Sequence, residues 1–321
     1  MSLLEIKDLS VSYGDRDMIS GINMSVEKGD IVCLAGESGC GKSTLLKSIM
    51  NLPVLQTEIT KGEIIFDGVN VDDIPLKERF RSAGTHIGMV QQNPNGAFNP
   101  LRTYKAQFAE TMKSHDMEYD EDKILRAFES LNLSEGERIL KSRPYEMSGG
   151  MNQRIVIAMS MLLKPKLLLC DEPTSALDVT TQKQVIEEIM KLRDENDTAV
   201  LLVTHNMGVV SMMADHVGIM YAGHIVEYGE KQKVLKRPAH PYTRALLSAI
   251  PDFSFKLPKG LDGQPPLNGA VMRECAFMER CAFKHEECRE CSYELKEIGA
   301  GHKTACEAGR ADRSVITGNF G

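Results

Sequence analysis

Short apolar patterns separated by glycine turns open the chain. Apolar and polar residues alternate over residues 4–9 and 22–26, which predicts short antiparallel strands. Residues 31–35 form a continuous apolar run, typical of a strand that is buried on both faces. After a glycine-rich turn, apolar residues recur at helical spacing over residues 45–50. We therefore expect a strand, a glycine loop and a helix in this order.

Patterns of buried strands return in the second half of the chain. Apolar runs of strand length cover residues 167–170, 200–203 and 217–220, and helical periodicity over 184–193 separates the first two. This alternation predicts a parallel sheet of the α/β class. From about residue 93 to residue 156 the sequence is charged and helix-prone, which predicts a helical insert.

Composition narrows the class of protein. The 321 residues are 42% hydrophobic and 26% charged, so a globular chain of about two domains is expected. No run of about 18 apolar residues occurs, and the sequence therefore predicts no membrane span. The first residues lack an apolar signal region, which predicts a chain that stays in the cytoplasm. The net charge of −7 argues against a nucleic-acid partner.

A glycine-rich segment between strand 31–35 and the following helix fits the motif G-x-x-x-x-G-K-[ST]. In such a loop, backbone amides surround the α- and β-phosphates of a nucleotide, the lysine reaches the β- and γ-phosphates, and the next hydroxyl binds Mg²⁺. An ordinary glycine turn is the weaker interpretation in this context. The predicted ATP-binding residues are Gly36, Glu37, Ser38, Gly39, Cys40 (through its backbone), Gly41, Lys42 (also catalytic), Ser43 (also a Mg²⁺ ligand) and Thr44.

Two further segments carry candidate chemistry. Asp171 and Glu172 end the buried strand 167–170, and ligands collect at the carboxyl ends of parallel strands. Asp171 is therefore predicted to bind Mg²⁺, and Glu172 to polarise the water that attacks the γ-phosphate. A second glycine-rich segment opens a predicted helix whose N-terminal amides can hold phosphate oxygens. It consists of Ser148, Gly149, Gly150 and Met151.

The order of these motifs resembles that in the ATPase subunits of ABC transporters. The resemblance implies four more site residues: Gln92 at Mg²⁺, Asp178 in the D-loop 175–178, His205 at the γ-phosphate and Tyr13 against the adenine ring. Gln92 and His205 are implied as catalytic, with Gln91 as an alternative to Gln92. Without the resemblance, a lone histidine at a strand end is more often a packing or surface residue.

The family's mechanism implies that two ATPase subunits close head to tail, with residues 148–151 of one covering the ATP held by residues 36–44 of the other. Met147 and Met151 depart from the commonest signature. The sequence Ser-Gly-Gly-Met is familiar in the first ATPase subunit of dipeptide, oligopeptide and nickel importers, and the segments 98–100 and 240–243 resemble the same branch.

The resemblance also implies partners and a location. These are a second ATPase subunit in an expected heterodimer, two membrane permease subunits and an extracytoplasmic solute-binding protein, at the cytoplasmic face of the cell membrane. The cofactors are ATP and Mg²⁺. The solute stays open between a dipeptide, an oligopeptide, and nickel or a metal chelate.

Residues 1–235 are predicted as the ATPase domain, and residues 236–321 as a C-terminal extension with five of the eight cysteines. Four thiolates can hold Zn²⁺ or an iron–sulfur cluster, but the paired C-x₂-C pattern usual for zinc is missing. The importer branch carries this pattern, and the resemblance implies a [4Fe–4S] cluster on Cys275, Cys281, Cys288 and Cys306. Zinc and reduced thiols are the alternatives, and Cys291 has no assigned role.

The sequence disfavours two other functions. A soluble ABC-type ATPase that acts on DNA or ribosomes usually has two cassettes in one chain or long coiled-coil arms, and this sequence has neither. A non-catalytic partner with a decayed ATP site is disfavoured because Lys42, Asp171, Glu172 and His205 are all present.

Overall fold

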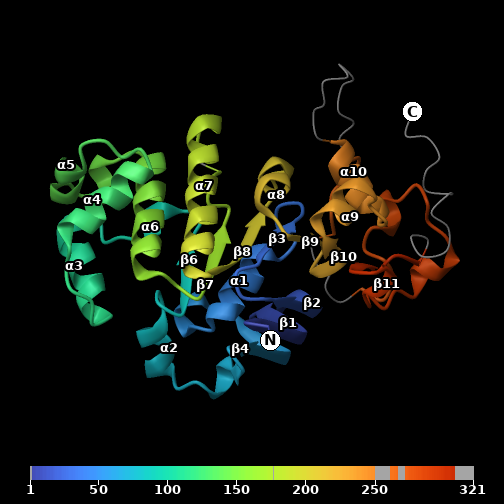
Figure 1. Ribbon diagram of the computed structural model, residues 1–321. Helices are drawn as coiled ribbons and strands as arrows, with labels where there is room; N and C mark the ends of the chain where they lie inside the picture. The colour runs from blue at the N-terminus through green and yellow to red at the C-terminus, as the bar shows by residue number, and fades with distance from the viewer. Residues whose placement is uncertain (1, 176, 250–260, 267–271, 308–321) are drawn as a thin grey trace. The chain divides into compact units, whose positions relative to one another are not determined.

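The computed structural model describes residues 2–175, 177–249, 261–266 and 272–307 (Figure 1). The chain divides into two compact units. One comprises residues 1–3, 26–30 and 73–202, and is called the helical unit below. The other comprises residues 4–25, 31–72 and 203–321, and is called the loop unit because it contains the phosphate loop.

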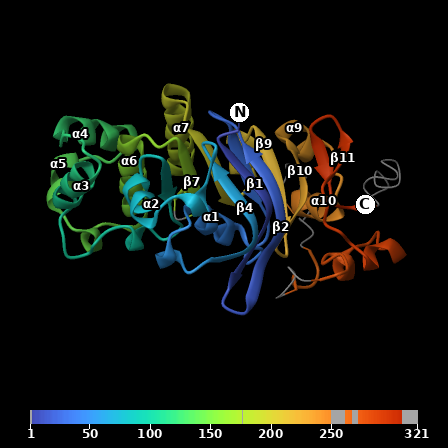
Figure 2. The ribbon, with the colours of Figure 1, turned by 90° about the horizontal axis from the view of Figure 1, so that it is seen from below.

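The loop unit begins with a four-stranded sheet of order β2-β1-β4-β5. Its strands are β1 (Leu4–Tyr13), β2 (Arg16–Val26), β4 (Glu58–Phe66) and β5 (Val69–Asn70). β4 pairs antiparallel with both β1 and β5, and Figure 2 shows β1, β2 and β4 side by side. The alternation predicted over residues 4–9 is confirmed, since Leu4, Ile6 and Leu9 are buried.

A second set of strands in the loop unit carries the phosphate loop. It contains β3 (Ile31–Ala35), β9 (His216–Tyr221), β10 (His224–Glu230), β11 (Lys296–Gly299) and β12 (His302–Thr304). β3 pairs parallel with β9, and the pairs β9–β10, β10–β12 and β12–β11 are antiparallel. Two strands that follow residue 235 thus continue the sheet that contains β3. Periodicity did not predict them, because each is too short to show an alternating pattern.

Four α-helices lie in the described part of the loop unit. They are α1 (Lys42–Met50), α8 (Met207–Met213), α9 (Lys231–Lys236) and α10 (Pro241–Ser248). Short 3₁₀ turns are η1 (Pro53–Leu55), η2 (Val71–Asp73), η6 (Met278–Arg280) and η7 (Glu286–Arg289). α1 follows β3 through the glycine loop, which confirms the predicted order of strand, loop and helix.

The helical unit contains neighbouring strands in the order β8-β7-β6: β6 (Ile87–Val90), β7 (Leu167–Asp171) and the start of β8 (Ala199–Thr204). β6 and β7 are parallel, and β6 is a strand that the sequence patterns did not predict. Its helices are α2 (Leu76–Ser82), α3 (Tyr104–Ser114), α4 (Glu121–Ser130), α5 (Gly136–Lys141), α6 (Gly149–Leu163) and α7 (Val179–Asn196), with 3₁₀ turns η3 (Pro94–Gly96) and η4 (Pro144–Glu146).

The helical insert is confirmed. α3, α4 and α5 gather beside α6 (Figure 1), around a core in which the rings of Phe108 and Phe128 meet edge to face at 5.6 Å. In the described ranges, no helix is both long and apolar enough to cross a membrane.

Candidate functional site

The phosphate loop, residues 36–44, joins β3 to α1. Gly41 precedes α1 with φ of 104°, a conformation that glycine adopts without strain. Because the cap residue is a glycine, it has no side chain that could accept a hydrogen bond from the first amides of α1. Unpaired amides at a helix N-terminus form an anion-binding site. The loop therefore fits the phosphates of a nucleotide.

The loop is packed tightly against neighbouring strands. A Cβ atom on Gly36 would lie 2.2 Å from the carbonyl oxygen of Met220 in β9. A Cβ atom on Gly41 would lie 2.5 Å from Cγ2 of Ile19 in β2. Both glycines are required by space, and they hold the loop backbone close to the sheet.

Lys42 is buried within the loop, with 7% of its surface exposed. Its ammonium donates to the carbonyl oxygens of Gly36 at 2.7 Å and Glu37 at 2.9 Å. Burial raises the pKa of the nearby Cys40 thiol, while the Lys42 charge opposes this effect. Cys40 is therefore held as a neutral thiol, consistent with a role through its backbone.

Two more predicted residues lie in the loop unit. Tyr13 ends β1, half-buried, and the Lys47 ammonium of α1 lies 5.9 Å from the centre of its ring. His205 follows β8 and is exposed, directly before Asn206, whose side chain caps α8. Both residues stand at the end of a strand, where a loop residue can meet a ligand.

In the helical unit, the two candidate carboxylates come at the end of β7. Asp171 and Glu172 are 6% and 9% exposed. Glu172 has φ of 48°, a left-handed conformation that is uncommon outside glycine and clusters at functional sites. Its carbonyl oxygen accepts hydrogen bonds from the Ser175 amide at 3.2 Å and the Ser175 hydroxyl at 3.1 Å.

The D-loop after these carboxylates contains Ala176, which lies outside the described residues. Asp178 caps α7, because its carboxylate accepts from the amides of Thr180 and Thr181 and from the Thr181 hydroxyl. These bonds, led by the one from the Thr181 hydroxyl, hold the pKa of Asp178 below its usual value. Asp178 therefore stays ionised at neutral pH.

The second glycine-rich segment begins α6, as predicted. The Ser148 hydroxyl accepts a hydrogen bond from the Met151 amide at 3.2 Å. A Cβ atom on Gly149 would have no neighbour within 4 Å, so nothing near it in the chain requires this glycine. Ser148 and Gly149 are exposed at this helix end, which is therefore accessible to a ligand or a partner.

Sequence reasoning missed Gln153, which ties this helix to the glutamine loop. The buried Gln153 side chain donates to the carbonyl oxygen of Gln91 at 3.3 Å, and Gln92 beside it is exposed. Gln153 lies only two residues after Met151, but the residue it contacts is 62 positions away in the sequence, so no local pattern indicated the contact. This hydrogen bond connects α6 to the segment that contains Gln92, within the helical unit.

Sequence reasoning also missed three residues around Glu37. The Glu37 amide donates to the Tyr242 hydroxyl at 2.9 Å, and the Glu37 carboxylate pairs with Arg280, which also contacts Tyr221. In the sequence, the segment 240–243 only resembled the importer branch and indicated no chemistry. In the structure, its residue Tyr242 contacts the phosphate loop.

The cysteines predicted to form a four-thiolate site lie between residues 275 and 306. A hydrogen bond with the Cys291 thiol, followed by burial, raises the pKa of Cys275, and burial raises that of Cys281. Across the described ranges, no group of three or more His, Cys, Asp or Glu side chains is arranged to hold a metal ion. The cluster implied for Cys275, Cys281, Cys288 and Cys306 is therefore not supported by the arrangement of the described residues and stays a prediction.

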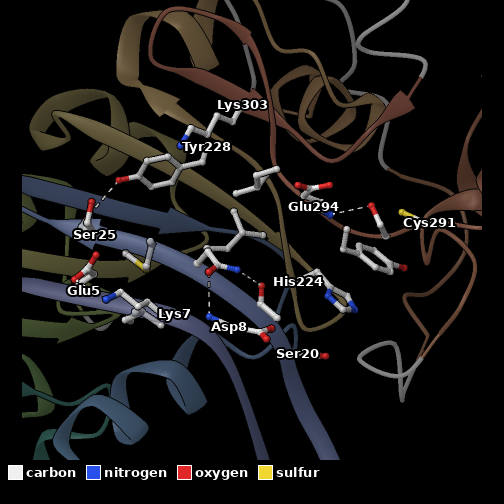
Figure 3. Close-up of a pocket in the computed structure, with 18 of the residues that line it drawn as sticks. Glu5, Lys7, Asp8, Ser20, Ser25, His224, Tyr228, Cys291, Glu294 and Lys303 are labelled. Carbon is white, nitrogen blue, oxygen red and sulfur yellow. Dashed lines mark hydrogen bonds and ion pairs between the residues drawn. The ribbon is translucent and has the colours of Figure 1, made fainter. Parts of the chain in front are cut away.

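A cleft of about 960 Å³ lies elsewhere in the loop unit (Figure 3). It is lined by strands β1, β2 and β10 and by the tail segment 291–295, where the rings of His224 and Tyr293 stack at 3.6 Å. No residue of the phosphate loop lines it. This cleft is separate from the nucleotide-binding loop.

Comparison with known proteins identifies the family. Residues 19–175 match the ABC transporter family, and residues 226–288 match the oligopeptide/dipeptide transporter C-terminal region. The chain is 39% identical over 316 residues to a probable peptide ABC transporter ATP-binding protein of Sinorhizobium fredii, covering 95% of this chain and 94% of that protein. The chain belongs to the ATP-binding subunits of ABC transporters.

Two further similarities agree with this family. The metal-staphylopine import system ATP-binding protein of Staphylococcus aureus is 39% identical over 253 residues, which cover 77% of this chain and 93% of that one. A solved ATP-binding subunit of an ABC transporter matches with a TM-score of 0.63 at 26% identity, covering 73% of this chain and 92% of that one. This ABC subunit is thus an ATPase whose hydrolysis is coupled to transport.

The helix that carries Tyr242 begins at a buried histidine. The Nδ1 atom of His240 accepts from the Tyr242 amide at 3.0 Å, while the His240 amide donates to the Glu227 carboxylate at 2.8 Å. Burial lowers the pKa of His240 to about 4, although the Glu227 charge opposes the shift. The imidazole is therefore neutral in the folded state.

We expect this histidine to make stability depend on pH. In the unfolded chain His240 titrates near 6.5. Between pH 6.5 and pH 4 the unfolded state therefore binds more protons than the folded state. The free energy of unfolding falls by up to about 1.4 kcal/mol for each pH unit in this range. The stability that the neutral His240 contributes is fully present above pH 6.5 and is lost as the pH falls toward 4. His240→Asn keeps a cap acceptor, and its melting temperature is expected to fall less than that of wild type from pH 7 to pH 5. Parallel curves for the two proteins would refute this assignment.

Proposed function

We propose that this chain is an ATP-hydrolysing subunit that powers the import of a peptide or a related small solute through a membrane ABC transporter. One observation carries the proposal: a phosphate loop at the N-terminus of α1 lies in the same compact unit as the region matching oligopeptide and dipeptide transporters. The relatives named above act on peptides and on metal–staphylopine, so peptide and metal chelate are the two solute classes to test.

Each predicted site residue has a place in the proposed reaction. The loop amides and Lys42 bind the phosphates, with Tyr13 against the adenine. Ser43, Gln92 and Asp171 are the oxygen ligands proposed for Mg²⁺, which when bound withdraws negative charge from the phosphate oxygens. Glu172 orients the attacking water and accepts its proton, and His205 contacts the γ-phosphate.

The proposed catalytic cycle requires a second ATPase subunit. The helix end at residues 148–151 supports this, because Ser148 and Gly149 are exposed and the amides of a helix N-terminus suit the phosphate of an ATP held by another subunit. We propose a heterodimer that docks on two permease subunits at the cytoplasmic face of the membrane, with an extracytoplasmic solute-binding protein. Residues 1–235 would form its ATPase domain and 236–321 the extension.

Gly149→Ala tests the composite site. Because the added methyl group meets open space within the chain, the melting temperature is expected to change by less than about 2 °C. Hydrolysis in the assembled transporter is expected to fall about tenfold, since the methyl group would occupy the surface that faces the partner's ATP. Unchanged hydrolysis in the assembled transporter would contradict the head-to-tail arrangement.

The import function is tested with the full transporter in sealed vesicles. The vesicles contain ATP, and labelled peptide or labelled nickel chelate is added outside together with the solute-binding protein. We expect uptake of one of the two solute classes, and no uptake when ATP is omitted. Hydrolysis that no solute of either class stimulates would argue against the proposed cargo.

The iron–sulfur cluster stays a prediction that the observed thiol arrangement does not support. Anaerobic purification followed by iron and acid-labile sulfide assays tests it. Iron and sulfide near four per chain would establish the cluster, whereas stoichiometric zinc or no metal would remove it.

A further inference from the structure

Glu37 sits in the phosphate loop, yet its carboxylate is turned toward the C-terminal extension. Arg280 binds it with two parallel hydrogen bonds, 2.8 Å from Nη1 to Oε2 and 2.9 Å from Nη2 to Oε1. The side chains of Arg280 and Glu37 are 6% and 25% exposed. A bidentate, largely buried pair of this kind is among the strongest polar contacts in proteins. The extension and the loop are therefore joined by an ion pair across 243 residues of sequence.

The guanidinium of Arg280 is fixed from other directions as well. Its Nε donates to the Asp262 carbonyl oxygen at 2.9 Å, and Nη1 also donates to the Tyr221 hydroxyl at 3.2 Å. It lies 5.8 Å from the ring centre of Tyr221 and 5.9 Å from that of Phe277. The turn η6 ends at Arg280 and delivers it to this position. A side chain held at so many points is preorganised for a single partner.

The main chain of Glu37 is held by the same region. Its amide donates to the buried Tyr242 hydroxyl at 2.9 Å, so this amide points to α10. The rings of Tyr221 and Tyr242 lie 4.5 Å apart, and Phe277 packs against both at 5.3 and 5.5 Å. Residues of the extension thus hold both the backbone and the side chain of the second loop residue.

We propose that Arg280 is a positioning residue for the nucleotide, which neutralises Glu37 and keeps the loop backbone in its ATP-accepting conformation. This inference rests on the proposed function, because the ligand it concerns is MgATP. Without Arg280, a partly buried carboxylate would stand unpaired in the loop that must accept a multiply charged phosphate chain. Like charges at short range repel, and a buried charge without its partner favours movement of the loop.

The test measures MgATP affinity of the purified subunit by equilibrium binding. Arg280→Ala is expected to raise the Kd about tenfold, and Arg280→Lys less, because a lysine supplies the charge without the bidentate geometry. The double variant Arg280→Ala with Glu37→Gln is expected to recover most of the affinity, since the unpaired charge is gone. Arg289→Ala is the matched control: Arg289 is an exposed tail residue paired with Glu286 at 3.3 Å, and wild-type affinity is expected.

Steady-state hydrolysis in the assembled transporter gives a second readout. Arg280→Ala is expected to raise KM for ATP with kcat within about twofold, because Arg280 holds the loop and touches no reacting atom. Wild-type affinity in Arg280→Ala, or no recovery in the double variant, would overturn the proposal. If Arg280→Ala does not fold, Arg280→Lys decides, since an unchanged Kd there overturns the proposal as well. Failure of the wild-type chain to bind MgATP would refute the proposed function instead.

Discussion

Replacing Glu172 by Gln is expected to lower ATP turnover of the assembled transporter at least about 100-fold while MgATP still binds. Glutamine has the shape of glutamate and keeps the hydrogen bonds of the main-chain carbonyl to Ser175, but it cannot accept a proton from the attacking water. ATP is then expected to stay bound, uncleaved, between two closed subunits. Phosphate release and retained nucleotide are measured on the same preparation.

The matched control for this variant is Glu187→Gln. Glu187 lies on α7 of the same unit, with its side chain 57% exposed and 3.7 Å from Lys183. An exposed pair at this spacing is worth only tenths of a kcal/mol, so turnover is expected to stay at the wild-type level. Turnover of Glu172→Gln within a few-fold of wild type would show that another group accepts the proton.

Replacing Gly36 by Ala is expected to weaken MgATP binding of the isolated subunit about 100-fold. The new methyl carbon would lie 2.2 Å from the carbonyl oxygen of Met220, a distance that requires backbone to move. β9 is paired with β3 on one side and β10 on the other, so the phosphate loop must move instead. Overpacking of this kind also costs about 1–3 kcal/mol of stability, visible as a lower melting temperature.

Gly149→Ala serves as the control for the Gly36 variant. Both add one methyl group to a glycine-rich motif, but the methyl group at Gly149 meets no atom within 4 Å. MgATP affinity of the isolated subunit is therefore expected to be unchanged in Gly149→Ala and lost in Gly36→Ala. Equal affinities in the two variants would mean that the loop is not constrained by β9.

Much of the fold could be predicted because its signals are local. The buried strands at residues 31–35 and 167–170 and the helix at 184–193 are continuous or periodic apolar patterns, and the structure places β3, β7 and α7 there. The candidate ATP residues were found in the same way, since the phosphate-loop motif is a fixed spacing within nine residues. The proposed roles of these residues stay predictions until the variants are measured.

The cysteines show what spacing cannot decide. The family resemblance implied a cluster on four of them, but whether thiols converge depends on tertiary geometry, and in the structure Cys275 is hydrogen-bonded to Cys291, the cysteine without an assigned role. The segment that carries these cysteines consists of short turns and short strands, so the spacing of two cysteines in the sequence does not determine the distance between their thiols.

By itself, the sequence determined the α/β core, the helical insert and the chemistry of the phosphate loop, because each depends on neighbours within a few residues. Only the tertiary structure decided that β12 of the extension pairs with β10, and that Arg280 and Tyr242 hold Glu37. These contacts join residues 73 to 243 positions apart, and no local pattern encodes such a partner. The extension, which the sequence presented as an appendage, is for this physical reason part of the support of the nucleotide loop.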